Sequence, residues 1–152
     1  MTTISIHDHP FCAPLLTIYD PPRELYLLGQ LPAGPSLAVV GARRMTPYGA
    51  AVIASFVPAL VRAGLTIVSG LAFGCDAAAH RATLAAGGRT VAVLGSGLDP
   101  ASLYPQSHAG LAQEIVAVGG ALLSEYPPGT RPLKHHFPTR NRLIAGLTQG
   151  VL

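Results

Sequence analysis

The richest polar stretch of the sequence lies near its end. Residues 134–142 carry three fixed positive charges, on Lys134, Arg140 and Arg142. The same nine residues include the ring of Phe137 and the amide of Asn141. Lysine and arginine neutralise phosphates, and an aromatic ring gives a nucleobase a surface to stack on. The combination indicates a site for single-stranded nucleic acid.

The same residues also have a purely structural interpretation. In it, Phe137 belongs to the core, while Arg140 and Arg142 cap loops or pair with Asp99 or Glu125. Taken alone, the stretch supports the two interpretations equally.

A second candidate site lies after the first strongly apolar run of the chain. Residues 37–40 are all apolar, which is typical of a parallel strand covered on both faces. Gly41 follows, then Arg43 and Arg44, and then Thr46, which precedes a proline in the manner of a helix N-cap. Free amides at a helix start beside two arginines predict an anion site. The pattern G-x-G-x-x-G is absent, so a dinucleotide is not favoured and no cofactor is expected.

Other polar residues that follow strands do not form a convincing catalytic set. Asp76 fits best as the N-cap of its own helix, and Glu125 as a residue that holds its loop. His80 lies one helical turn after Asp76, but a metal site would need a third ligand, and none is evident. Ser96 lacks the G-x-S-x-G frame of a nucleophile elbow. We therefore expect neither an enzyme nor a metal site.

These residues require a framework that brings distant segments together. Strands are predicted over residues 37–40, 66–69, 90–94 and 121–124, and helices over residues 50–63, 76–86 and 109–118, with a last helix that starts in the basic stretch. Strand–loop–helix units in succession predict a Rossmann-like three-layer α/β domain with a parallel sheet. The glycines after the strands should then converge at one edge of the sheet: Gly41, Gly70, Gly74, Gly95 and Gly97. Pro58 predicts a kink or break within the first helix.

The composition limits the classes of protein to which the chain can belong. Of the 152 residues, 49% are hydrophobic and 11% charged, which is not typical of a disordered chain. No stretch approaches the length that a membrane span needs, and we expect no membrane association. Cys12 and Cys75 suggest neither a disulfide framework nor a metal set, which favours a cytoplasmic location. Residues 1–36 are rich in proline and are predicted to be a strap packed on a core formed by residues 37–152.

Five segments of the sequence resemble the DprA/Smf family of DNA-processing proteins in content, order and spacing. They are GARRMTPYG from Gly41, VSGLAFGCDAAAH from Val68, VLGSGLD from Val93 with Tyr104 and Pro105 after it, LSEYPPG from Leu123, and HFPTRNRLIAGL from His136. The resemblance covers the chain from about residue 14 to its end.

The resemblance implies a Rossmann-like domain that binds single-stranded DNA without catalysis. It also implies protection of incoming DNA during natural transformation, assistance in loading the RecA recombinase, and a homodimer. Arg43 matches the family's phosphate-gripping arginine, and Lys134 and Phe137 match residues that line the same pocket. The expected DNA-binding residues of this chain are Gly41, Ala42, Arg43, Arg44, Lys134, Phe137, Arg140, Asn141 and Arg142.

One departure from the family is the end of the chain, at Leu152, where a further strand would begin. We therefore expect a truncated domain with an uncovered sheet edge and uncovered apolar helix surface. Two alternatives to DNA binding remain. One is a nucleoside monophosphate-cleaving enzyme of the lysine-decarboxylase-like group, although its Pro-Gly-Gly-x-Gly-Thr loop is missing. The other is an interaction protein that has lost DNA binding.

Overall fold

The computed structural model describes residues 1–152, and a six-stranded mixed sheet runs through its centre. The strands are β1 (Thr2–Ser5), β2 (Glu24–Gly29), β3 (Ser36–Ala38), β4 (Thr66–Ser69), β5 (Thr90–Leu94) and β6 (Ala121–Ser124). Their order across the sheet is β1-β2-β6-β5-β4-β3. The four strands β3 to β6 pair in parallel, which confirms the predicted α/β framework.

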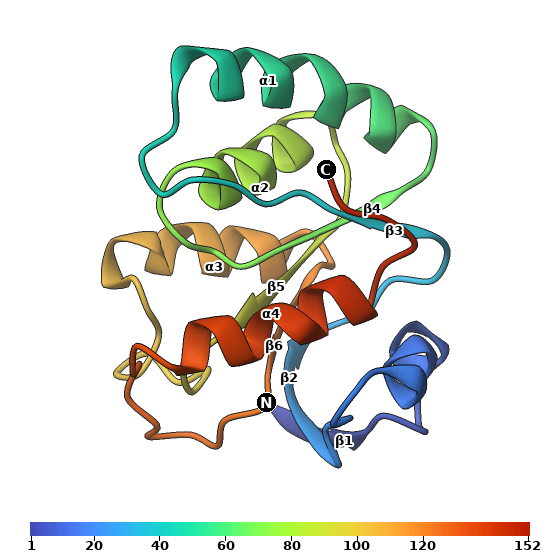
Figure 1. Cartoon of the computed structure of the whole chain (residues 1–152), viewed down its shortest axis with the longest axis vertical. Coiled ribbons are helices and arrows are strands. Elements are labelled where there is room, and N and C mark those ends of the chain that lie inside the picture. Colours follow the sequence, from blue (N-terminus) through green and yellow to red (C-terminus); the bar gives the residue numbers. More distant parts are fainter.

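Helices cover both faces of this sheet. They are α1 (Pro47–Arg62), α2 (Cys75–Ala85), α3 (Ala109–Ala117) and α4 (His136–Gly146), with the 3₁₀ helices η1 (Pro10–Thr17) and η2 (Gln106–His108). Figure 1 shows α4 crossing the sheet, with η1 beside its C-terminal end.

Alternation along the strands divides the core into two faces. Val91 and Val93 of β5 pack with the apolar side of α4 and with η1. Ala92 and Leu94, the neighbours that point the other way, pack with α2 and α3. Because successive strand residues face opposite sides of a sheet, one apolar strand supplies both cores. The result is the three-layer arrangement predicted from the sequence.

The N-terminal segment joins the sheet, so the sheet is not parallel throughout as predicted. Strands β1 and β2 pair with each other, and β2 pairs with β6, in antiparallel register. The η1 segment lies on α4, where Gly146 leaves room for Leu15 and Ile18. The apolar run at residues 25–28 has no clear alternation, so its role as a strand could not be recognised from its pattern.

Helix α1 begins as predicted but is not broken at Pro58. The hydroxyl oxygen of Thr46 accepts a hydrogen bond from the Gly49 amide at 3.1 Å, and the helix continues as one element to Arg62. Ile53 and Val57 pack with Ile67 of the sheet, and this packing offsets the loss of the backbone hydrogen bond that proline removes.

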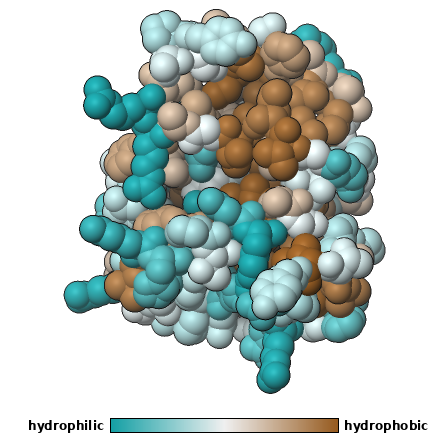
Figure 2. All heavy atoms as spheres, in the orientation of Figure 1, coloured by the Kyte–Doolittle hydropathy of each residue, from teal (hydrophilic) through white to brown (hydrophobic).

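The last residues of the chain run beside β3. The Leu152 amide donates to the Ala38 carbonyl oxygen at 2.8 Å, and the Val40 amide donates to the Leu152 carbonyl oxygen at 3.1 Å. Figure 2 shows apolar side chains gathered around this end of the chain, where Val40, Val151 and Leu152 are exposed. None of the helices is both long enough and apolar enough to cross a membrane.

Candidate functional site

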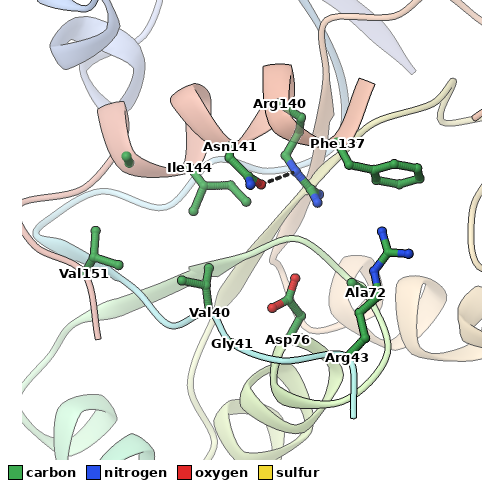
Figure 3. A pocket seen from close by; sticks show the side chains of 11 residues that line it. Val40, Gly41, Arg43, Ala72, Asp76, Phe137, Arg140, Asn141, Ile144 and Val151 are labelled. Carbon is green, nitrogen blue, oxygen red and sulfur yellow. Dashed lines mark hydrogen bonds between the residues drawn. The ribbon is translucent and has the colours of Figure 1, made fainter. Parts of the chain in front are cut away.

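Two cavities lie on either side of a contact between Arg43 and Phe137. The guanidinium carbon of Arg43 is 5.0 Å from the centre of the Phe137 ring, a distance typical of a cation–π contact. The first cavity, of about 310 Å³, is shown in Figure 3, and the second has a volume of about 570 Å³. Arg43, Phe137 and Asn141 line both cavities, so these three residues form a shared wall.

The loop between β3 and α1 is held in place by the turn that precedes α2. The Cys75 amide donates to the Ala42 carbonyl oxygen at 3.2 Å. Gly74 has a φ of 75°, and a Cβ atom there would overlap the carbonyl oxygens of Ala42 and Arg43. A glycine is therefore required for this close approach, which fixes the backbone that carries Arg43.

Arg140 forms part of the floor of the first cavity. It is 4% exposed, and its Nη1 donates to the carbonyl oxygen of Gly70 at 2.8 Å and to that of Val93. Its Nε donates to the Asn141 side-chain oxygen at 3.2 Å. Burial lowers the pKa of the guanidinium, and the nearby Asp76 carboxylate partly opposes this shift. Nη2 has no hydrogen-bond partner within the chain and is available to a ligand in the cavity.

Asp76 lies beside Arg140 in the same cavity and is 5% exposed. The predicted N-cap role is wrong, because Gly74 occupies the cap position and no side chain caps the helix. One carboxylate oxygen of Asp76 instead accepts a hydrogen bond from the Gly70 amide at 3.1 Å. Burial raises the pKa of this carboxyl, opposed by Arg140 and by the backbone amides of Ala72, Gly41 and Gly70. Asp76 therefore joins the loops after β3 and β4.

Phe137 lies at the N-terminal end of α4, next to the end of β5. A Cβ atom on Gly95 would lie 3.3 Å from the Phe137 ring and 3.4 Å from the His136 backbone. The imidazole of His136 is 3.1 Å from the Gly95 carbonyl oxygen and stacks on Tyr126, with ring centres 4.0 Å apart. The lack of a side chain at Gly95 thus allows α4 to approach the sheet edge, as the predicted convergence of glycines requires.

The second cavity contains Lys134 and one aromatic residue, Tyr104, that is not among the predicted DNA-binding residues. Besides the shared wall, it is lined by Tyr104, Pro132, Lys134 and Pro138. The Tyr104 ring centre is 5.7 Å from that of Phe137, and the rings are tilted by 55°. Arg43 and Lys134 bring two positive charges to this cavity, and its lining includes no acidic residue.

Six of the nine predicted residues therefore come together around the two cavities: Gly41, Arg43, Lys134, Phe137, Arg140 and Asn141. Ala42 and Arg44 are exposed in the same loop but line neither cavity. Arg142 also lies outside them and donates to Glu125 at 2.7 Å, with Asp20 at 3.8 Å. That pairing is the one the structural interpretation of this stretch proposed.

The remaining polar candidates have partners elsewhere. The Ser96 hydroxyl is buried and donates to the Gly97 carbonyl oxygen at 3.3 Å. His80 is fully buried, and its Nδ1 lies 2.7 Å from the Thr90 hydroxyl rather than on Asp76. No group of three or more His, Cys, Asp or Glu side chains is arranged to hold a metal ion. The site that Arg43, Phe137 and Lys134 form is a cationic and aromatic surface with two cavities.

Two solved structures share this fold. DNA processing protein A from Streptococcus pneumoniae matches with a TM-score of 0.85 and 42% identity, over 99% of this chain and 52% of that one. DNA processing protein A from Helicobacter pylori, whose structure was described for its single-stranded DNA binding mode, also has a TM-score of 0.85, with 33% identity over 99% of this chain and 66% of that one.

Sequence comparison gives the same relationship. Protein Smf from Synechocystis is 46% identical over 144 residues, which are 91% of this chain and 35% of that protein. DNA processing protein DprA from Bacillus subtilis is 42% identical over 152 residues, covering 98% of this chain and 50% of that protein. The chain thus spans half or less of the length of these two relatives. The family model described as DNA recombination-mediator protein A matches residues 2–152, and the chain belongs to that family.

Proposed function

We propose that this chain binds single-stranded DNA at the two cavities beside Arg43 and Phe137. The observation that carries the proposal is the placement of the Arg43 guanidinium over the Phe137 ring, with Arg140 on one side and Lys134 on the other. The binding mode for which the Helicobacter pylori relative was described supports this choice of ligand.

In the proposed mode, cationic groups take the DNA backbone and apolar groups take a base. Arg43, Arg140 and Lys134 are positioned to contact phosphates, because they line the cavities and present nitrogen donors. Phe137, Val40 and Ile144 provide apolar surface in the first cavity for one base. Asn141 and the backbone at Gly41 complete the contact. Because phosphates and ring faces are common to all nucleotides, little sequence preference is expected.

We further propose that the role of the protein is binding without catalysis. In this role the protein protects incoming DNA during natural transformation and assists RecA loading, as a cytoplasmic homodimer. Membership of the DNA recombination-mediator protein A family supports this role over nucleoside monophosphate cleavage.

The experiment that tests the site compares two arginine variants of equal charge. Arg43→Ala removes a cation from both cavities, whereas Arg62→Ala removes one from the exposed end of α1. We expect Arg43→Ala to weaken binding to every labelled single-stranded oligonucleotide alike in fluorescence anisotropy. It should also reduce the slope of log affinity against log salt by about 0.7, the value for one phosphate contact. Equal effects of the two variants would contradict the proposed site.

A further inference from the structure

Two side chains pack against the ring of Phe137. Arg43 lies over the ring, and the Tyr104 ring, tilted by 55°, has its centre 5.7 Å from that of Phe137. Arg43 and Phe137 line both cavities, whereas Tyr104 lines only the second. One ring in this position cannot serve bases in both cavities at once, so a second base on the side of Lys134 needs another surface.

Tyr104 offers such a surface. The residue is 37% exposed, although its neighbours Leu103 and Pro105 are buried. The Tyr104 hydroxyl makes no hydrogen bond within the chain, so no polar contact of the side chain explains where it lies. A large aromatic ring exposed at the wall of a cationic cavity has the composition of a base-stacking platform.

The segment that carries Tyr104 is fixed before any ligand arrives. Asp99 accepts hydrogen bonds from the Ser102 amide at 3.1 Å and from the Gly129 amide at 2.7 Å, which joins the loop after β5 to the loop after β6. The hydrogen bond from the Gly129 amide is also the main cause that lowers the pKa of the Asp99 carboxyl. A loop backbone that is already held in position loses less conformational entropy on binding.

We propose that Tyr104 is a second base-stacking residue, so that the site takes two neighbouring nucleotides of one strand, one in each cavity. Phe137 receives a base in the first cavity, and Tyr104 receives the adjacent base in the second. Arg43, which lines both cavities, is placed to contact the phosphate between them, and Lys134 the phosphate that follows. This inference rests on the proposed binding of single-stranded DNA.

The test uses three substitutions of Tyr104 in the 152-residue chain, with fluorescein-labelled oligo-dT as the probe. Tyr104→Ala should weaken binding by about 5- to 150-fold, the range for loss of one base–aromatic stack. It should leave the salt slope unchanged because no charge is lost, whereas Lys134→Ala should reduce that slope. Tyr104→Phe should keep the parental affinity, since the ring remains. Tyr19→Ala, at a residue 95% exposed in the N-terminal segment, is the matched control.

A second readout detects stacking directly and does not depend on removing the ring. The chain has no tryptophan, so Tyr104→Trp introduces the only one, and oligo-dT should quench its fluorescence. Tyr19→Trp should show no quenching. If the parent chain binds oligo-dT, Tyr104→Ala binds it equally well and Tyr104→Trp is not quenched, then the second platform is wrong while the proposed function stands. If the folded parent chain does not bind, both are overturned.

Discussion

Arg140 and Arg142 are two residues apart on α4 and therefore point to nearly opposite sides of the helix. Arg140 enters the sheet edge and binds the carbonyl oxygens of Gly70 and Val93. Arg142 instead pairs with Glu125 at 2.7 Å. The guanidinium that faces the cavity is thus held by two backbone carbonyl oxygens, with the Asp76 carboxylate nearby, and its Nη2 remains available to an anionic ligand.

Burial of His80 makes the stability of the fold depend on pH. The Thr90 hydroxyl donates to the Ile67 carbonyl oxygen, so the His80 Nδ1 donates to Thr90 and leaves Nε2 buried without a partner. Burial lowers the pKa of His80 to about 3. The unfolded chain binds the proton near pH 6.5, so stability is greatest above that pH and falls as the pH drops towards 3.

Because of His80, we expect the free energy of unfolding to be about 2 kcal/mol lower at pH 5 than at pH 7. Urea unfolding of the parent chain and of His80→Gln at the two pH values measures this difference, because glutamine does not titrate. His7→Gln, at an exposed histidine, is the control. The same loss of stability with pH in the parent and His80→Gln would show that burial of His80 does not control it.

The turn before α2 depends on a glycine that no other residue can replace without strain. Gly74 caps α2 at positive φ and has no room for a Cβ atom beside the Ala42 and Arg43 carbonyl oxygens. Gly110, on α3, does not have a positive φ, and a Cβ atom added there would meet nothing within 4 Å. The two glycines therefore allow a matched comparison of the same substitution.

Gly74→Ala should destabilise the chain by about 2 kcal/mol, because the backbone that carries Arg43 must move. It should also weaken oligo-dT binding. Gly110→Ala should raise stability by about 0.5 kcal/mol, since alanine loses less backbone entropy in a helix. Urea unfolding and fluorescence anisotropy measure the two effects. Equal stability of the two variants would mean that the close approach at Gly74 does not hold the loop.

The elements differ in how well the sequence predicts them. Strands β4, β5 and β6 agree with the predicted ranges because each is a short apolar run between glycine-rich turns. The antiparallel strands β1 and β2 were not predicted, since their pairing depends on the exposed edge of β6 and not on their own pattern. The continuity of α1 through Pro58 is likewise decided by packing.

At the scale of the whole molecule, the site joins segments that are far apart in the chain. The loop at Arg43, the turn at Asp76 and the start of α4 at Phe137 meet where the parallel strands end (Figure 3). Sheet topology predicts that the glycine-containing loops meet at this edge, whereas Phe137 was placed in one pocket with Arg43 through the resemblance to the DprA/Smf family. The burial of Arg140 could not be predicted because it depends on how α4 packs on the sheet. The position of Tyr104 could not be predicted because it depends on contacts between the loops after β5 and β6.

We propose that the molecule, with a net charge of +3, selects single-stranded DNA through this site and not merely by its charge. The most direct measurement is fluorescence-anisotropy titration of labelled oligo-dT at low and moderate salt, with matched duplex DNA as the control. We predict tighter binding to the single strand, with an affinity that falls as salt rises. A folded sample that binds neither DNA, or that binds the duplex equally well, would contradict the claim.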